Sequence, residues 1–243
     1  MRSGKGFLDW RSTSLVCYIN SIMKILITAG GTTEKIDDVR VITNSATGRL
    51  GAKIADAFAA SVRPCDITYI CSGNAARPER ADVKVSLTSG VESVMEAVQR
   101  ACAETPYDVI IHSMAISDYQ VKAVLDSLDS RQDIREKKIS SNREDLVVVL
   151  KKAPKIIALL RGLAPGAVIV GFKLLSGAGE EDLIKAGGEL LKKNDCDFVF
   201  ANDISTINED SHEGFLIKRD GTYEKASGKE EIAALIAERT LNR

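Results

Sequence analysis

The fold is decided by residues 23–33, which have the sequence MKILITAGGTT. Residues 24–28 form a continuous apolar and β-branched run, which is typical of a parallel strand buried on both faces. The run leads directly into Gly30 and Gly31, where a phosphate-binding loop would follow the first strand of an α/β sheet. The spacing matches neither GxGxxG nor the P-loop pattern, so the glycine pair alone leaves a tight turn and a ligand loop equally open.

Short β-branched runs alternate with helical stretches along the rest of the chain. We expect strands at Lys24–Thr28, Ile67–Cys71, Val83–Leu87, Val109–Ser113, Ala167–Phe172 and Phe198–Ala201. We expect helices at Gly48–Ala60, Val91–Glu104, Pro154–Leu163 and Glu180–Lys193. This alternation predicts an α/β fold: a Rossmann-like, doubly wound and mostly parallel sheet with helices on both faces.

The last part of the chain predicts a β-hairpin and a final helix. An Asp-Gly pair at 220–221 separates two extended segments, Gly214–Lys218 and Thr222–Lys225, which is a hairpin signal. We expect Ser227 to cap a helix at Lys229–Leu241. Because no linker is visible, residues 23–243 are predicted to form a single domain. Residues 1–22 lack the period of a helix or strand, and we expect a disordered leader that is non-native or comes from an upstream start.

Composition and charge exclude several classes of protein. The 243 residues include 33 Lys and Arg, 34 Asp and Glu and 44% hydrophobic residues, which is typical of a soluble globular protein and not of a bulk nucleic-acid binder. No apolar run approaches the roughly 20 residues of a membrane span. Five cysteines without CxxC spacing suggest neither a disulfide framework nor a zinc site, and they fit a reducing cytoplasm. Because His112 and His212 are the only histidines, we expect catalysis to depend on Lys, Asp, Asn or backbone groups.

A polar segment without periodicity, residues 34–51, begins after the glycine pair and runs into the first helix. It carries Arg40, Asn44, Ser45 and Thr47, so several hydrogen-bond donors precede a helix N-terminus that is suited to anions. From these residues alone, a Rossmann-type NAD(P)-dependent oxidoreductase and a non-catalytic nucleotide-binding protein are alternatives. The oxidoreductase lacks its glycine fingerprint and the acidic ribose ligand that would follow about 20 residues later.

Four segments, in order, resemble phosphopantothenate–cysteine ligase, also called phosphopantothenoylcysteine synthetase. They are Ile27–Thr32 with Ile36–Gly48, Ala115–Tyr119, Lys138-Ile139 followed by Leu146–Ile156, and Val170–Phe172 followed by Asn202–Ser205. The spacing is similar to that of the stand-alone bacterial ligases. In that group the phosphopantothenoylcysteine decarboxylase, which acts next in the pathway, is a separate protein.

The resemblance implies a two-step ligase reaction of coenzyme A biosynthesis. The carboxylate of 4′-phosphopantothenate attacks the α-phosphate of a nucleoside triphosphate, and the amine of L-cysteine then displaces the nucleotide from the acyl-nucleotide. The resemblance implies CTP, with ATP as the alternative, Mg²⁺ held mainly by substrate phosphates, no flavin and no protein metal site. It also implies a cytoplasmic homodimer in which a flap around Val121–Asn142 covers the partner's site, with no nucleic-acid or membrane partner.

Two residues of the polar segment are expected to act in catalysis. By the resemblance, Asn44 hydrogen-bonds the acyl-nucleotide, whose carbonyl and phosphoryl oxygens suit an amide. Arg40 is expected to bind a carboxylate or a phosphate with its guanidinium fork. The alternatives are a helix cap for Asn44 and a surface ion pair with Asp37 or Asp38 for Arg40.

Two lysines are expected to contact the triphosphate. Lys138 matches the lysine of the flap, although Lys137 is an alternative for this role. Lys193 matches a second lysine near the phosphates. Glu189 stands where many relatives have a further lysine, so that contact is either absent or made by the lysine before Lys193. Because the chain is not basic overall, we expect Lys138 and Lys193 to converge with Arg40.

The remaining site residues follow from the same resemblance. The nucleotide is expected to contact His112, Ser113, Met114, Asp118, Pro154, Lys155, Ile156, Ile157 and Phe172. The expected substrate loop consists of Gly30, Gly31, Thr32, Thr47 and Gly48. The backbone of residues 112–114 would recognise the base, and Phe172 would pack on it from a strand end. The alternatives are a His112 that is simply satisfied at its strand end and a Phe172 that belongs to the core.

Overall fold

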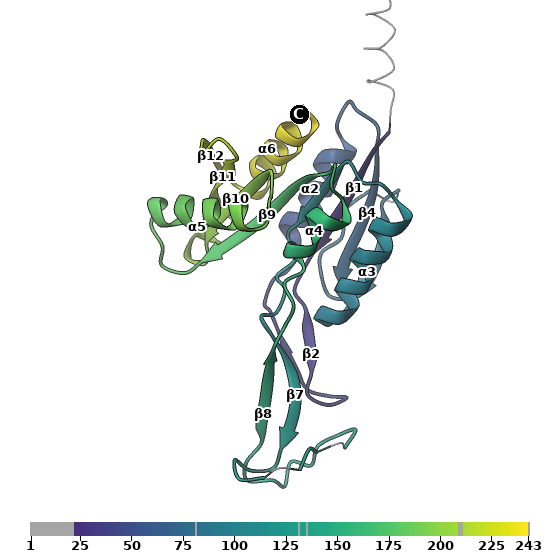
Figure 1. Cartoon of the computed structure of the whole chain (residues 1–243), viewed down its shortest axis with the longest axis vertical. Coiled ribbons are helices and arrows are strands. Elements are labelled where there is room, and N and C mark those ends of the chain that lie inside the picture. The colour runs from purple at the N-terminus through teal and green to yellow at the C-terminus, as the bar shows by residue number, and fades with distance from the viewer. Residues whose placement is uncertain (1–21, 81, 131, 135, 209–210, 243) are drawn as a thin grey trace, which may run out of the picture.

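One eight-stranded sheet organises the protein. The computed structural model describes residues 22–80, 82–130, 132–134, 136–208 and 211–242. The strand order is β12-β11-β10-β9-β6-β1-β4-β5 (Figure 1). The parallel strands are β1 Met23–Ala29, β4 Cys65–Ser72, β5 Lys84–Thr88, β6 Val109–His112, β9 Val168–Leu175 and β10 Phe198–Asp203. The antiparallel strands at one edge are β11 Glu213–Lys218 and β12 Tyr223–Ser227.

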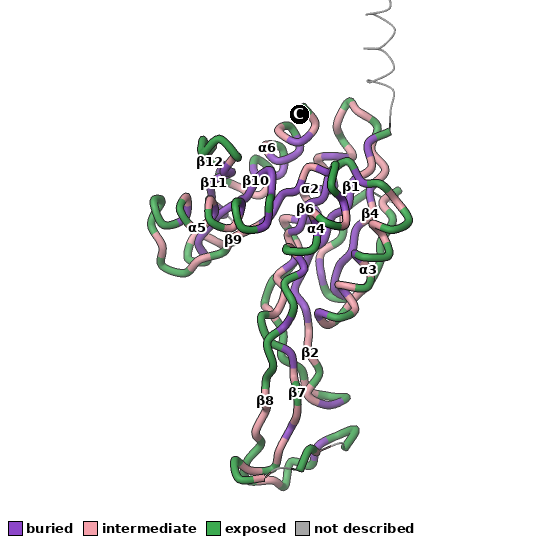
Figure 2. Tube along the Cα trace, viewed as in Figure 1, coloured by how far each residue is buried: buried purple, intermediate pink, exposed green. Residues whose placement is uncertain are grey.

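Helices cover both faces of this sheet. The helices are α2 Arg49–Ala59, α3 Val91–Glu104, α4 Ile157–Leu163, α5 Glu180–Lys193 and α6 Lys229–Leu241. α2 and α6 pack on the face that holds Ile27, whereas α3, α4 and α5 pack on the face that holds Leu26. Both side chains are fully buried, which explains why the first strand is a continuous apolar run (Figure 2). The predicted doubly wound α/β fold with a C-terminal hairpin and helix is confirmed.

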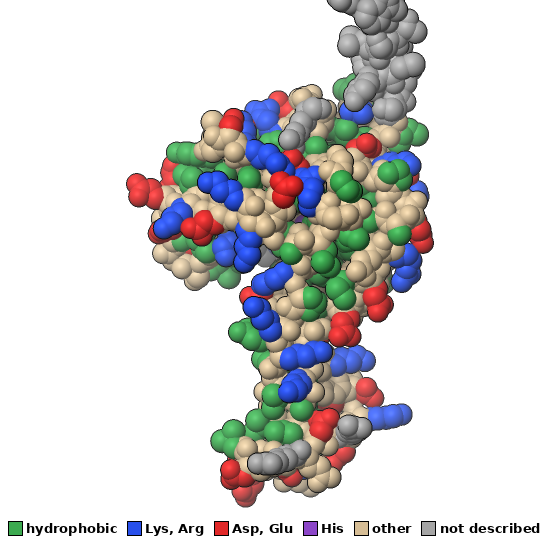
Figure 3. Space-filling model, in the orientation of Figure 1, with side chains coloured by type: hydrophobic (Ala, Val, Ile, Leu, Met, Phe, Trp, Pro, Cys, Tyr) green, Lys and Arg blue, Asp and Glu red, His purple; other side chains and the backbone are tan. Residues whose placement is uncertain are grey.

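Two antiparallel pairs leave the main sheet and form an extended arm. β7 Tyr119–Leu125 pairs with β8 Val147–Lys152, and β2 Thr33–Lys35 pairs with β3 Val41–Thr43. Figure 1 shows both pairs pointing away from the sheet in the same direction. Lysine and arginine side chains gather on the visible face where the arm leaves the body (Figure 3). These strands were not expected from the sequence, because β7 and its pairing partner β8 are separated by a long insertion. The first part of the expected polar flap is instead the ordered strand β7.

Two local expectations need correction. β9 continues to Leu175, so Phe172 lies inside this strand and not at its end. Ser227 is the last residue of β12, and Gly228, with a φ of 85°, takes the N-cap position of α6. Glu231 in the first turn of α6 reaches back, and its Oε2 accepts from the Ser227 amide at 3.3 Å.

Two predictions about the ends of the molecule remain open. Residues 1–21 lie outside the described residues, so the leader at 1–22 and the single domain at 23–243 stay predictions.

Among the helices that the structure describes, none has the length and apolar character that a membrane crossing requires.

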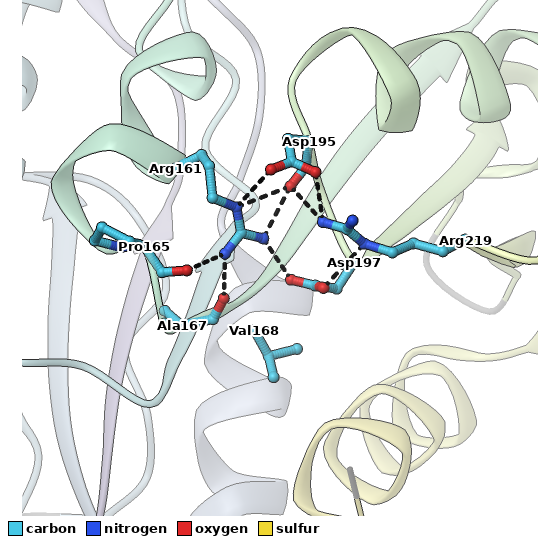
Figure 4. A pocket seen from close by; sticks show the side chains of 8 residues that line it. Arg161, Pro165, Ala167, Val168, Asp195, Asp197 and Arg219 are labelled. Atoms are coloured by element: carbon cyan, nitrogen blue, oxygen red, sulfur yellow. Dashed lines mark hydrogen bonds and ion pairs between the residues drawn. The ribbon is translucent and has the colours of Figure 1, made fainter.

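A cluster of ion pairs closes the amino-terminal edge of the parallel strands (Figure 4). Arg161 of α4 donates from Nη2 to Asp197 Oδ2 at 2.7 Å, and Arg219 donates from Nε to Asp197 Oδ1 at 3.1 Å. Both guanidinium groups also donate to the main-chain oxygen of Asp195, at 2.9 and 3.0 Å. Asp195 has a φ of 51°, a left-handed conformation that these bonds help to hold. The cluster therefore joins α4, the start of β10 and the hairpin.

Removal of one guanidinium from this cluster should destabilise the fold. We expect Arg161→Ala to lower the free energy of unfolding by about 2–4 kcal/mol, because the buried carboxylate of Asp197 loses a charged partner. Arg80→Ala, which removes an exposed pair with Asp82, is the matched control and should cost at most about 0.5 kcal/mol. Urea denaturation measures both values. Equal losses in the two variants would contradict this role of the cluster.

Candidate functional site

The loops that follow β1 and β6 form one hydrogen-bonded unit with Asn44. The Ala115 amide donates to the Gly30 carbonyl at 2.8 Å, and the Ala115 carbonyl accepts from the Thr32 amide at 3.1 Å. The same carbonyl accepts from Asn44 Nδ2 at 2.8 Å. Thr32 Oγ1 accepts from the Ser117 amide at 2.8 Å. This unit lies at the carboxyl edge of two neighbouring parallel strands, where α/β sheets bind ligands.

The glycines of the expected substrate loop allow a close approach of three backbone segments. A Cβ on Gly31 would collide with the main-chain oxygen of Asn44. Gly30 and Gly48 both have positive φ values, 87° and 73°, and a Cβ on Gly48 would lie 3.1 Å from the Gly30 nitrogen. A side chain at these positions would force the segments apart.

The N-terminus of α2 lies beside this glycine loop without a side-chain cap. Gly48 occupies the N-cap position, and no side chain accepts from the first helical amides. The alternative of Asn44 as a helix cap is therefore wrong, because its amide group binds the Ala115 carbonyl instead. Uncapped amides at a helix N-terminus favour a bound anion.

Arg40 and the Lys138 segment meet at the tip of the β2–β3 hairpin. Arg40 Nη1 lies 2.6 Å from Asp37 Oδ2, so the expected alternative of an ion pair is present. The same nitrogen donates to the carbonyl of Ile139, the residue after Lys138, at 3.2 Å. Lys138 is exposed, and so is Lys137, hence the choice between them stays a prediction. Within one chain, the extended residues 41–43 separate Arg40 from Asn44 by about 13 Å.

His112 is buried at the end of β6 and satisfied by β1. Its Nδ1 lies 2.9 Å from Thr28 Oγ1, and burial lowers the pKa of His112 to about 4. The Ser113 amide donates to the Thr28 carbonyl at 3.1 Å, and the Met114 amide to Thr28 Oγ1 at 3.4 Å. The amides of 113 and 114 therefore point toward β1. The alternative of a satisfied His112 is present in the structure, and recognition of a base by this backbone stays a prediction.

The base of the arm brings together several of the expected nucleotide contacts. Asp118 forms an ion pair with Lys155, and its carbonyl accepts from the Ala153 amide at 2.9 Å. Ile156 is buried in the core cluster beside α3 and α4. Residues 118 and 154–157, far apart in sequence, thus meet where the arm joins the sheet.

Gly171 lets α4 approach the sheet beside His112. These two residues are partners in the register of β6 and β9, and a Cβ on Gly171 would lie 2.9 Å from Ile157 Cδ1. Phe172 faces the opposite side of the sheet, where its ring lies 5.9 Å from that of Phe200. The core alternative for Phe172 is thus present, and a contact of its side chain with a base stays a prediction.

Lys193 lies apart from the other expected cations. It is the last residue of α5 and exposed. The following segment returns to the amino-terminal edge of the strands, because Asp197 donates its amide to the Ile169 carbonyl at 2.8 Å. Within one chain the structure therefore joins the segments of Arg40 and Lys138 but not Lys193. Its role, and the replacement for the lysine missing at Glu189, stay predictions.

Asp37 is the residue of this region that the sequence analysis missed as a functional candidate. Its side chain is fully buried. Burial alone would raise the pKa of Asp37, but the amides of Val39, Arg40 and Ile139 and the Arg40 charge outweigh it and lower the pKa to about 2. The signal in the sequence was the place of Asp37 in the pattern Ile36-Asp37-x-Val39-Arg40. Nothing else in this polar segment distinguishes a buried aspartate from an exposed one.

A metal centre is not indicated by the described side chains. No group of three or more His, Cys, Asp or Glu in that part of the chain is placed to hold a metal ion. Asp118 is engaged by Lys155, and Asp37 is surrounded by donors.

The fold and site define an α/β protein with a glycine loop and a helix N-terminus at the carboxyl edge of its sheet. Residues 21–242 match the family model described as DNA/pantothenate metabolism flavoprotein C-terminal domain. The chain belongs to this family. It is 32% identical, over 81% of its length, to the coenzyme A biosynthesis bifunctional protein CoaBC of Thermococcus kodakarensis, of which the alignment covers 45%. The chain spans about half the length of the curated relatives it matches.

Solved structures support the same relationship. The DNA/pantothenate metabolism flavoprotein from Streptococcus pneumoniae shares 33% identity and a TM-score of 0.81, with 90% of this chain and 99% of that chain covered. The Cab2 mutant H337A in complex with phosphopantothenate-cysteine has a TM-score of 0.67, with 95% and 91% covered. At 17% identity, this second likeness shows the fold alone.

The burial of His112 predicts a pH dependence of stability. Its pKa falls from 6.5 to about 4 on folding, so the unfolded chain binds more protons between these values and acid favours unfolding. The stability is fully present above pH 6.5 and is lost as pH falls toward 4. We expect His112→Gln to reduce the loss of unfolding free energy between about pH 7 and about pH 5 by about 2 kcal/mol. Urea denaturation of both proteins at the two pH values tests this, and an unchanged pH dependence would contradict it.

Proposed function

We propose that the chain is a phosphopantothenate–cysteine ligase that works through an acyl-nucleotide. The observation that carries this proposal is the position of Asn44, which Ala115 and the β1 loop hold beside the uncapped N-terminus of α2. Family membership supports it, since relatives are named coenzyme A biosynthesis bifunctional proteins. The Cab2 structure of the same fold is described as a complex with phosphopantothenate-cysteine, the product of such a ligase.

The first step would join substrate and nucleotide. The phosphate of 4′-phosphopantothenate suits the N-terminus of α2 and the glycine loop, with Thr47 at the same boundary. The substrate carboxylate then attacks the α-phosphate of the triphosphate, an anhydride bond forms, and pyrophosphate leaves with the electron pair of the broken bond. Arg40 and Lys138 are the cations we assign to the triphosphate, where they offset the charge of the leaving pyrophosphate.

The second step would transfer the acyl group to cysteine. The amine of L-cysteine attacks the acyl carbon, an amide forms, and the nucleoside monophosphate leaves. One hydrogen of Asn44 Nδ2 is used on Ala115, so the second hydrogen can donate to a carbonyl or phosphoryl oxygen of the anhydride, while Oδ1 remains free to accept. Asn44 positions the intermediate by hydrogen bonds and forms no covalent bond to it.

CTP is the nucleotide we propose, with Mg²⁺ bound to its phosphates and with no flavin. We assign the base to the root of the arm, where the Asp118–Lys155 ion pair joins residues 112–118 to residues 154–157. Supplying phosphopantothenate, cysteine and Mg²⁺ with either CTP or ATP, and following pyrophosphate, tests both claims. We expect faster release with CTP. Equal or faster release with ATP would refute the choice of CTP, and no release with either would refute the ligase.

We also propose that the enzyme is a cytoplasmic homodimer. Within one chain, the extended strand β3 separates Arg40 from Asn44 by about 13 Å, a separation that a partner's arm could bridge. The hairpin and the arm expose apolar side chains, among them Val39 and Leu128. A separate decarboxylase would consume the product, phosphopantothenoylcysteine.

An NAD(P)-dependent oxidoreductase gains no support from the arrangement of these elements. In a dinucleotide-binding fold the first helix follows the glycine loop of the first strand directly. Here the β2–β3 hairpin intervenes between the Gly30–Gly31 pair and α2. We therefore propose no second function.

The role of Asn44 predicts a specific defect. We expect Asn44→Ala to lower formation of phosphopantothenoylcysteine by about 100-fold or more, because the anhydride loses its hydrogen bonds. Asn242→Ala, at the end of α6, is the control and should match the unsubstituted protein. Product formation is measured by mass spectrometry, with circular dichroism to confirm the fold. Normal turnover in a folded Asn44→Ala variant would refute the role of this side chain.

A further inference from the structure

The carboxylate of Asp37 accepts four hydrogen bonds at the tip of the β2–β3 hairpin. Oδ1 accepts from the amides of Val39 and Arg40, at 2.8 and 2.6 Å. Oδ2 accepts from Arg40 Nη1 at 2.6 Å and from the Ile139 amide at 3.1 Å. The side chain is fully shielded from solvent. Because every partner is a donor, only an ionised carboxylate, which has acceptors alone, satisfies this set.

These bonds join two segments that lie about 100 residues apart in sequence. Two further bonds connect the same segments: the Asp38 amide donates to the Lys137 carbonyl at 2.8 Å, and Arg40 Nη1 donates to the Ile139 carbonyl at 3.2 Å. Figure 1 shows the β2–β3 hairpin following the β7–β8 ribbon along the arm. We call the set of bonds around Asp37 the Asp37 clasp.

The clasp sets the positions of two cations around a buried carboxylate. The Arg40 side chain uses Nη1 for its hydrogen bonds in the clasp, and 39% of this side chain stays exposed. Lys138 is held by its backbone neighbours on both sides, since the Lys137 carbonyl and the Ile139 amide are both in the clasp. The Lys138 side chain is exposed. The ends of both cationic side chains therefore remain available to a ligand.

We propose that Asp37 is a positioning residue that fixes Arg40 and Lys138 relative to each other, so that the two cations bind one polyphosphate as a unit. The inference rests on the proposed function, and it goes beyond it because it assigns a role to a residue that touches no substrate. Without the clasp each cation would still be present. Binding of the polyphosphate would then have to order both segments, and the entropy lost in ordering them would weaken binding.

The location of the clasp separates this role from general stability. All of its bonds lie at the hairpin tip and on residues 137–139 of the arm. None of its residues except Ile139 and Asp37 is buried, and the two core clusters of the sheet include none of them. Loss of the clasp should therefore loosen the tip and leave the sheet intact.

The test compares Asp37→Asn with Asp38→Asn in the full chain. Both substitutions remove one negative charge at adjacent positions, but the side chain of Asp38 is exposed. Asn at 37 would place an NH₂ group against donors, which should lower kcat/KM for the nucleotide by about tenfold or more. Asp38→Asn should stay within about twofold of the unsubstituted enzyme. Comparable kcat/KM values in the two variants would overturn the proposal.

A double-mutant cycle separates positioning from mere destabilisation. Lys138→Ala and Lys137→Ala are made alone and together with Asp37→Asn, and kcat/KM for the nucleotide is measured. If the clasp acts through the flap lysine, the double variant should be about as impaired as the worse single variant, because the interaction is lost only once. Independent multiplication of the two losses, or no loss in either lysine variant, would overturn the proposal.

Amide hydrogen exchange at Ile139 gives a readout that needs no activity. Loss of the Asp37 acceptor should speed its exchange about tenfold or more in Asp37→Asn relative to Asp38→Asn, while amides of β1 stay protected in both. Equal exchange at Ile139 would overturn the clasp. Absence of pyrophosphate release from the unsubstituted protein would instead overturn the proposed function, so the two failures are distinguishable.

Discussion

The main-chain carbonyl of Ala115 is the point at which the parts of the site are joined. It accepts from the Thr32 amide after β1 and from the side chain of Asn44 before α2. The bond from Asn44 requires Gly31, since any Cβ there would push the Asn44 backbone away. Gly31 is therefore needed for packing of backbone on backbone. A helix N-terminus, an amide side chain and a loop from the neighbouring strand share one edge of the sheet as a consequence.

The second part of the machinery lies on the arm, away from that edge. Arg40 and the Lys138 segment are joined to each other by Asp37, whereas the extended strand β3 separates them from Asn44. The proposed chemistry divides in the same way. The acyl group needs fixed hydrogen bonds at the sheet, and the triphosphate needs cations that can approach from outside. Such a division explains why a protein with a near-neutral net charge can present a local cluster of cations.

Most of the sheet could be predicted from the sequence because its strands are buried on both faces. Ile25, Leu26 and Ile27 have no exposed area, and such strands appear as continuous apolar runs. The arm could not be predicted. β7 and β8 are only partly buried, and they pair across a long insertion, so neither periodicity nor a turn signal marks them.

The candidate site was predicted less completely, for reasons that depend on tertiary contacts. Asn44 and Arg40 were proposed from the resemblance, but the burial of Asp37 depends on residues 137–139 and cannot be recognised in a polar segment. Lys193 illustrates the opposite case. The sequence around a lysine at the end of a helix does not indicate which edge of the sheet it lies near. For Lys193 this is determined by the following segment, which returns to the sheet at Ile169.

The central claim is that the carboxylate of phosphopantothenate is activated as an acyl-nucleotide. The most direct measurement uses phosphopantothenate labelled with ¹⁸O in its carboxylate, together with CTP, Mg²⁺ and cysteine, followed by mass spectrometry of the products. Attack on the α-phosphate predicts that one ¹⁸O atom appears in the nucleoside monophosphate and none in the pyrophosphate. Label in inorganic phosphate, with release of a nucleoside diphosphate, would show an acyl phosphate and would contradict the account.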